Sequence, residues 1–124
     1  MKFTLDSRND LHLIRGYADG EVRIADLVQR APCIVTADRL ILDWPARDVA
    51  TLSLAQLEPL FALQPDVVLL GTGVKQIFPA SVIRQEFARR RIGLEVMNLG
   101  AACRTYNILV QEERRVAAVL FPGG

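Results

Sequence analysis

The pattern of apolar and polar residues changes about halfway along the chain. In the first part, short stretches alternate in polarity, which is typical of strands joined by tight turns. The pattern predicts one hairpin over Leu11–Ile24, with the pair Asp19-Gly20 at its turn. It predicts a second hairpin with strands Cys33–Thr36 and Leu40–Trp44. We therefore expect two β-hairpins in the N-terminal part.

The second part combines helical spacing with continuous apolar runs. Ser53–Leu63 has the spacing of an amphipathic helix with Ser53 as its N-cap, although Pro59 favours a later start or a bend. Pro79–Arg91 is predicted as a helix that Gly93 ends. The run Asp66–Gly73 suits a strand buried on both faces. The remaining predicted elements are a strand at Leu94–Met97, a helix at Asn98–Arg114 and a closing strand at Arg115–Phe121.

This order of elements, hairpins and then β-α-β-α-β, predicts the fold class. We expect an α/β protein in which helices pack on a central mixed β-sheet and the N-terminal β-hairpins form a further layer. Val67–Leu70 and Leu94–Met97 are expected to be parallel neighbours joined through the helix Pro79–Arg91. A length of 124 residues suits a single domain, residues 1–124.

Composition narrows the functional classes. The net charge of +1 gives no overall field that would attract nucleic acid or a membrane surface. The opening residues MKFTLDSRND lack the apolar core of a signal peptide, and no apolar run reaches the roughly 20 residues of a membrane span, so we expect a cytoplasmic protein without membrane insertion. His12, Cys33 and Cys103 are too few and too scattered for a zinc site, and we expect reduced cysteines, no metal and no cofactor.

Candidate chemistry gathers at one edge of the predicted sheet. The Gly71-Thr72-Gly73 loop and the start of the Asn98–Arg114 helix leave the carboxyl edge, where open α/β sheets bind ligands. Asn98 is expected to cap the helix, and free N–H groups behind it favour an anion. Gly100 allows a close approach to the backbone.

The same helix carries a polar stripe. Arg104, Asn107, Gln111 and Arg114 follow at spacings of three, four and three, with apolar residues on roughly the opposite side. The stripe is either a solvated helix face or a surface for a ligand or partner. The candidate ligand- or partner-binding residues are Gly71, Thr72, Gly73, Asn98, Arg104, Thr105, Asn107 and Arg114.

No catalytic constellation emerges from the sequence. Gly71-Thr72-Gly73 lacks the spacing of a phosphate-binding loop. Glu112 and Glu113 are adjacent and therefore point in different directions, which disfavours a catalytic carboxylate pair. Trp44 beside Pro45 is either a core residue or an exposed docking aromatic, and burial is the commoner state of a lone Trp.

The segments LGTGVKQIFP and GLEVMNLGAACRTYNILVQEERRVAAVLFP resemble a small family of unknown biochemical function. The family includes mitochondrial NADH dehydrogenase (complex I) assembly factor 3 and an adipogenesis-associated animal protein. The resemblance implies an α/β domain without established catalysis. For the mitochondrial members it implies binding to assembly intermediates and to a second assembly factor.

Two functions follow as hypotheses. The first is a non-catalytic protein-interaction or assembly factor, with protein partners of a respiratory complex. The alternative is a small anionic-ligand-binding protein or enzyme with its site at the Gly71-Thr72-Gly73 loop and the start of the Asn98–Arg114 helix. Either is compatible with a homo-oligomer that covers the strand edges of the hairpins.

Overall fold

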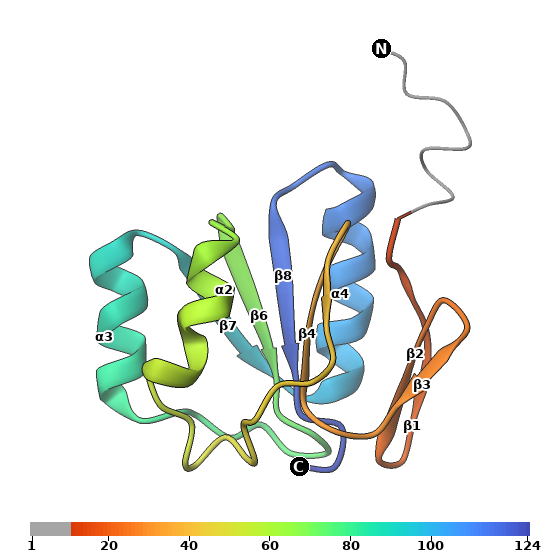
Figure 1. Ribbon diagram of the computed structural model, residues 1–124, viewed down its shortest axis with the longest axis horizontal. Coiled ribbons are helices and arrows are strands. Elements are labelled where there is room, and N and C mark those ends of the chain that lie inside the picture. The colour runs from red at the N-terminus through yellow and green to blue at the C-terminus, as the bar shows by residue number, and fades with distance from the viewer. Residues whose placement is uncertain (1–10) are drawn as a thin grey trace.

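A five-stranded mixed sheet forms the centre of the computed structural model, which describes residues 11–124 (Figure 1). Its strand order is β5-β4-β8-β6-β7. Residues 1–10, from which the sequence predicted the lack of a signal peptide, lie outside the described residues. The strands of this sheet are β4 (Cys33–Thr36), β5 (Leu40–Ile41), β6 (Val67–Gly71), β7 (Gly93–Met97) and β8 (Val116–Leu120).

The parallel core of the sheet is the one that the sequence predicts. β6 pairs in parallel with β7 on one side and with β8 on the other. β4 then pairs antiparallel with β8, and β5 antiparallel with β4. The mixed sheet is therefore confirmed, and β5 is shorter than expected because the chain leaves the sheet before Trp44.

Trp44 belongs to the core. Its side chain is only 5% exposed, its Nε1–H donates to the carbonyl of Gln56 at 2.7 Å, and its ring centroid lies 5.7 Å from that of Phe121. A buried indole needs a partner for its N–H, and the Gln56 carbonyl supplies one. The interpretation of Trp44 as a core residue is confirmed.

The predicted first hairpin is part of a small three-stranded antiparallel sheet. β1 (Ile14–Ala18) and β2 (Glu21–Ile24) are joined at Asp19-Gly20, where Gly20 has φ +75°. A third strand, β3 (Leu27–Gln29), pairs antiparallel with β2 and was not predicted. Three residues are too short for an alternating pattern to stand out.

The helices begin and end near their predicted positions. The region of Pro59 forms a 3-10 turn, η1 (Ala55–Leu57), followed by α2 (Glu58–Ala62), so the helix does start late. α3 is Ser81–Arg90, and Arg91 in the left-handed region (φ +60°) ends it, so the prediction that Gly93 ends this helix was wrong. Gly93 is the first residue of β7.

The helix α4 (Leu99–Gln111) is shorter than predicted. Glu113 takes a left-handed conformation (φ +62°), and its N–H and that of Arg114 turn back to the carbonyls of Val110 and Leu109. These two bonds form a Schellman motif, which terminates the helix without a glycine. The prediction that Arg114 extends the helical stripe was therefore wrong.

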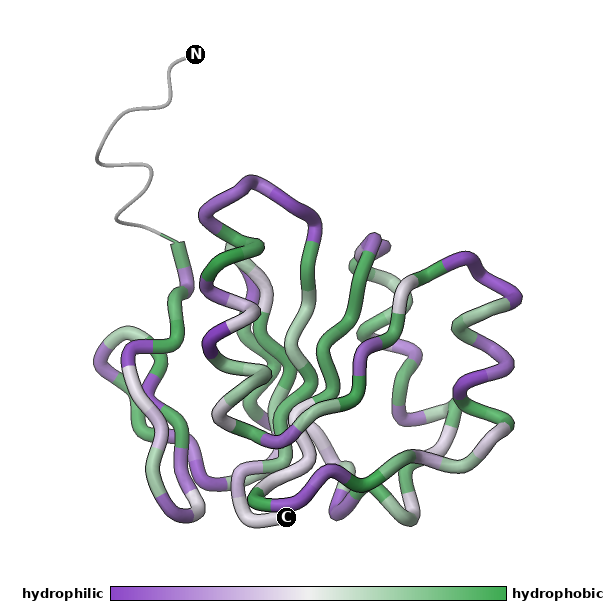
Figure 2. Tube along the Cα trace, turned by 180° about the vertical axis from the view of Figure 1, so that it is seen from behind, coloured by the Kyte–Doolittle hydropathy of each residue, from purple (hydrophilic) through white to green (hydrophobic). Residues whose placement is uncertain are grey.

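Side chains of the central strands alternate between two cores. In β6, Val68 and Leu70 pack toward α2 and α3, whereas Leu69 packs toward α4 and the small sheet. In Figure 1, α2 and α3 lie on one side of the sheet and α4 on the other, with β1–β3 beyond α4. Figure 2 shows the strands as hydrophobic and the turn between α4 and β8 as hydrophilic. The α/β fold class is thus confirmed, and the first predicted hairpin forms the further layer, whereas the second, β4–β5, belongs to the central sheet.

Candidate functional site

Thr72 holds the loop after β6 in place through hydrogen bonds to the backbone. Thr72 is fully buried, its backbone N–H donates to the carbonyl of Met97 at 2.9 Å, and its hydroxyl donates to the carbonyl of Lys75. The same hydroxyl accepts the N–H of Ile77 at 3.0 Å. The predicted ligand residue Thr72 therefore fixes the loop that follows it.

The two glycines of the loop allow close packing. A Cβ on Gly71 would lie 2.9 Å from the Cβ of Ala102, so the absence of a side chain at Gly71 lets α4 pack closely on β6. Gly73 has φ +95°, a conformation that side chains rarely adopt, and a Cβ there would lie 2.1 Å from the carbonyl oxygen of Gly124. Both glycines serve the packing of the carboxyl edge.

The start of α4 is capped as predicted, but its amides are largely used. The Oδ1 of Asn98 accepts the N–H of Ala101 at 2.9 Å, which confirms Asn98 as N-cap. The N–H of Leu99 donates to the carbonyl of Gly73 at 2.7 Å, and that of Ala102 to the carbonyl of Asn98 at 3.0 Å. The expectation that free N–H groups here await an anion is therefore wrong for Leu99, Ala101 and Ala102.

The hairpin β1–β2 folds over this helix start. Arg104 donates a hydrogen bond to the hydroxyl of Tyr17, and its guanidinium carbon lies 5.9 Å from the centroid of the Tyr17 ring. A Cβ on Gly100 would lie 2.8 Å from the same ring. The close approach that Gly100 was expected to allow is thus made by Tyr17 of the same chain.

A shallow groove of about 450 Å³ remains between the hairpin turn and the carboxyl edge. Of the eight predicted residues it brings together Gly73, Asn98 and Arg104. Thr105 is half-buried and does not line the groove. Asn107 is absent from it because its side chain binds the backbone of β1.

Arg114 lies at the other end of the sheet. It lines a second groove, of about 510 Å³, together with Arg39 and Arg115 and with Asp38. Because α4 ends at Gln111, Arg114 belongs to the turn before β8 and not to the carboxyl edge. The predicted site residues therefore divide between two ends of the molecule.

Beyond the loop lies an exposed apolar segment that was not predicted from the sequence. Val74, Ile77, Phe78 and Val82 are all exposed, Val74 to 79% and Phe78 to 55%. They follow Gly73 directly and reach into the first turn of α3. In the sequence they stand in the run VKQIFPASV at spacings of three, one and four, which is typical of a helix face, but Pro79 interrupts the run. We call these four residues the apolar segment.

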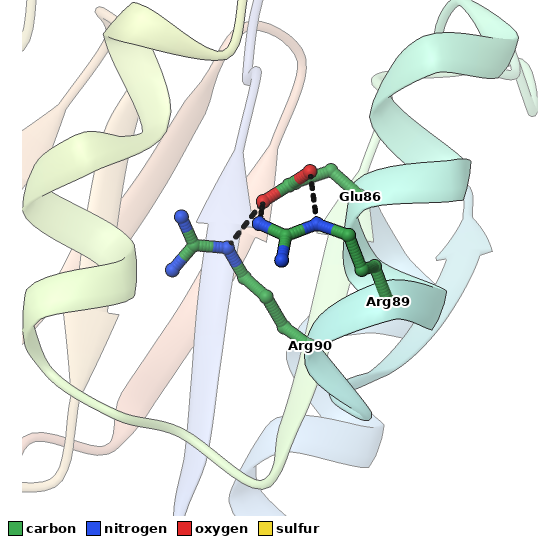
Figure 3. Close-up of polar contacts among 3 residues, drawn as sticks. All are labelled: Glu86, Arg89 and Arg90. Carbon is green, nitrogen blue, oxygen red and sulfur yellow. Dashed lines mark hydrogen bonds and ion pairs between the residues drawn. The ribbon is translucent and has the colours of Figure 1, made fainter.

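The helix that begins at this segment, α3, carries ion pairs in its second half. Glu86 accepts hydrogen bonds from Arg89 and Arg90, the latter at 2.7 Å (Figure 3). These bonds, Arg89 first, lower the pKa of Glu86 to about 2. The guanidinium of Arg90 also lies 4.0 Å from the ring centroid of Phe61, which joins α3 to α2.

Both cysteine thiols of the described residues are buried. Cys33 and Cys103 are free cysteines, and burial raises the pKa of both thiols to about 12. Burial also raises the pKa of Tyr106, whose hydroxyl donates to the carbonyl of His12 at 2.6 Å. In residues 11–124, no three His, Cys, Asp or Glu side chains gather as a metal site.

Comparisons with known proteins agree with the expected resemblance. Residues 14–121 match a family described as a protein of unknown function (DUF498/DUF598). The chain is 33% identical over 93 residues to NADH dehydrogenase (ubiquinone) 1 alpha subcomplex assembly factor 3 of Danio rerio, covering 73% of this chain and 53% of that protein. It thus spans about half the length of that relative.

A second relative carries a different name. The chain is 31% identical over 91 residues to a 13 kDa major membrane protein of Francisella tularensis, covering 72% of this chain and 73% of that one. Within residues 11–124, no helix has the length and hydrophobicity needed to cross a bilayer. The cytoplasmic location stays a prediction.

Solved structures share the fold. The NMR structure of a Xanthomonas campestris protein has a TM-score of 0.85 at 33% identity, covering 99% of this chain and 88% of that chain. The NMR structure of a Bordetella pertussis protein, described as an Mth938-like domain, has a TM-score of 0.81 at 25% identity, covering 100% of this chain and 94% of that chain.

Proposed function

This chain belongs to the DUF498/DUF598 family of proteins of unknown function, and we propose that it is a non-catalytic interaction protein that helps to assemble a larger complex. The observation that carries this proposal is the apolar segment, whose four large side chains are exposed one after another. Apolar side chains gathered in one exposed segment are typical of interaction sites. The name of the Danio rerio relative supports a role in the biogenesis of a respiratory complex.

The polar residues of the carboxyl edge support the same reading. The side chains of Thr72 and Asn107 form hydrogen bonds with the protein's own backbone, and the side chain of Arg104 donates a hydrogen bond to Tyr17. The thiols, with a pKa of about 12, are poor nucleophiles near neutral pH. These contacts support a structural role for Thr72, Asn107 and Arg104.

The alternative, an anion-binding protein with its site at the carboxyl edge, has less support. Arg104 does line a groove of about 450 Å³ there. However, the N–H groups of Leu99 and Ala101, which would hold an anion at the start of α4, already donate within the chain. An anion at this edge would depend mainly on Arg104.

The proposed function is tested by isolating the tagged chain from its native organism under mild conditions. We expect it to migrate on native gels in a particle well above its own 13.8 kDa, with subunits or assembly factors of one complex in fixed stoichiometry. An untagged strain is the control. A chain that migrates alone at every growth stage, or that turns over a substrate in the purified state, would overturn the proposal.

A further inference from the structure

We propose that the free edge of β7 is the docking site for an extended segment of a partner protein. The segment adds to the sheet as a further strand and places alternate apolar side chains in the groove beside α3. This inference rests on the proposed function and names the way in which a partner is held.

The backbone of β7 is open on one side. β7 is the last strand of the sheet, and its bonds to the rest of the sheet come from alternate residues. The N–H of Gly93 donates to Asp66 at 3.0 Å, and the carbonyl of Met97 accepts from Thr72 at 2.9 Å. Since backbone groups alternate between the two sides of a strand, those of Leu94 and Val96 point away from β6. They are placed to pair with a further strand.

One of these outward groups already has a substitute partner. The side-chain amide of Gln76 donates to the carbonyl of Val96 at 2.8 Å. This is the kind of bond that a backbone N–H of a neighbouring strand would make. An exposed strand edge that is neither paired nor covered is a template for strand addition, and a flexible side chain on it is easily displaced.

A groove continues the core beyond this edge. It has a volume of about 420 Å³, with Leu94 and Val96 from β7 on one side and Phe87 and Arg84 from α3 on the other. Phe78 of the apolar segment also lines it. A strand added to β7 would direct every second side chain into this groove. The occupant therefore carries apolar residues at alternate positions.

The groove is lined by one basic and one acidic side chain, Arg84 of α3 and Glu95 of β7, which do not form an ion pair with each other. The guanidinium of Arg84 lies 5.6 Å from the ring centroid of Phe78, and no carboxylate of residues 11–124 lies within 4.0 Å of it. An aspartate or glutamate of the partner would pair with it at the rim of the groove. The geometry points to an extended segment of alternating apolar residues with an acidic side chain.

A second copy of this chain fits the edge poorly. Pairing β7 antiparallel with itself about its centre would place one Glu95 opposite the other, and like charges directly opposite are destabilising. The other edge strand of the sheet, β5, has only two residues to offer. A lipid surface would contact the apolar segment but would leave the outward backbone groups of Leu94 and Val96 without strand partners. A strand of a partner protein would both contact the apolar segment and pair with these backbone groups.

The test is to select linear peptides from a random library on the folded, full-length chain. We expect enriched sequences to alternate apolar residues and to contain an acidic one. Peptides made from them are then titrated by fluorescence anisotropy against the wild type and three variants. Leu94→Pro removes an outward N–H together with a partly buried side chain, and Phe78→Ser removes an exposed wall of the groove. Circular dichroism checks that both variants retain the fold. Ile108→Ser is the matched control, since Ile108 is exposed on α4 outside the groove.

We expect the affinity to fall by about tenfold or more in Leu94→Pro and in Phe78→Ser and to stay unchanged in Ile108→Ser. Hydrogen exchange at the amides of Leu94 and Val96 should slow when peptide is bound. The proposal is overturned if no peptide is enriched, or if the enriched peptides bind both groove variants as well as the wild type. It is also overturned if the chain dimerises through β7 in sedimentation, or if vesicles of anionic lipid and not peptides bind the apolar segment.

An experiment can distinguish an incorrect β7 site from an incorrect proposed function. If the native particle forms, but a photo-crosslinker at Phe78 never joins the chain to a partner, the assembly role stands and the β7 site is wrong. If no native particle forms, the assembly role itself is wrong.

Discussion

Asn107 binds the backbone of Ile14 through both the oxygen and the nitrogen of its side-chain amide. Its Oδ1 accepts the N–H of Ile14 at 2.9 Å, and its Nδ2 donates to the carbonyl of Ile14 at 2.8 Å. The two residues are separated by 93 positions in the chain. One side chain on α4 therefore takes the place of a neighbouring strand for β1 and attaches the small sheet to the rest of the fold.

We expect Asn107→Ala to lower the free energy of unfolding by about 1–3 kcal/mol, because it leaves two partly buried backbone groups without partners. Urea unfolding followed by circular dichroism measures the loss. Gln111→Ala is the matched control, since Gln111 lies one turn further along the same side of α4 and is exposed. Equal stabilities for the two variants would show that the Asn107 bonds contribute nothing net.

Gly71 gives a second test of how α4 packs on the sheet. A Cβ there would lie 2.9 Å from Ala102 and 3.0 Å from Leu120, both fully buried. Gly71→Ala should therefore destabilise the protein by about 1–3 kcal/mol, the usual cost of overpacking a core. Gly93→Ala is the control in the neighbouring strand, because its Cβ would meet nothing closer than 3.5 Å. A smaller loss in Gly71→Ala than in Gly93→Ala would contradict this picture of the packing.

The ion pairs of α3 should show in the pH dependence of stability. Hydrogen bonds from Arg89 and then Arg90 lower the pKa of Glu86 from 4.5 to about 2. The unfolded chain therefore binds a proton at Glu86 more readily than the folded chain does. The stabilisation is fully present above pH 4.5 and is lost as the pH falls toward about 2. Because the Arg89 side chain is 69% exposed, the effect is small and its pH dependence is the informative quantity.

The measurement compares the urea midpoints of the wild type and Glu86→Gln at a series of pH values. We expect their difference to shrink as the pH is lowered through this window. Glu112→Gln, which removes an exposed carboxylate with no ion pair to residues 11–124, is the matched control. A difference that is constant with pH would mean that the Glu86 pairs do not contribute.

Most of the fold was predictable because its elements are long or strongly patterned. The runs at β6 and β8 are apolar throughout, since their side chains alternate between two cores, and that pattern indicates a strand covered on both faces. The missed β3 has three residues, and its pairing with β2 depends on tertiary position more than on pattern. Helix ends were predicted less well, because Arg91 and Glu113 adopt left-handed conformations that favour glycine.

The site was harder to predict, because a sequence shows which polar residues share a helix face but not what covers that face. Arg104, Asn107 and Gln111 do lie on one side of α4, as their spacing indicated. The first two contact Tyr17 and Ile14 of the small sheet. By contrast, the exposed apolar segment was not predicted, because Pro79 interrupts the helical spacing of its residues. Its exposure is a property of the fold and not of the pattern.

The thiols give a direct test of whether nucleophilic chemistry is available. Cys33 and Cys103 are 0% and 1% exposed, and burial raises the pKa of each thiol to about 12. Since only the thiolate attacks alkylating and disulfide reagents, both cysteines should resist iodoacetamide in the folded chain near pH 8. Both should react at once in concentrated guanidinium, with mass spectrometry counting the adducts. An Ile108→Cys variant is the positive control, because Ile108 is 56% exposed and its replacement should be labelled in the folded state. If a native thiol reacts as fast as that control, a cysteine is accessible and activated, and the non-catalytic proposal loses one of its supports.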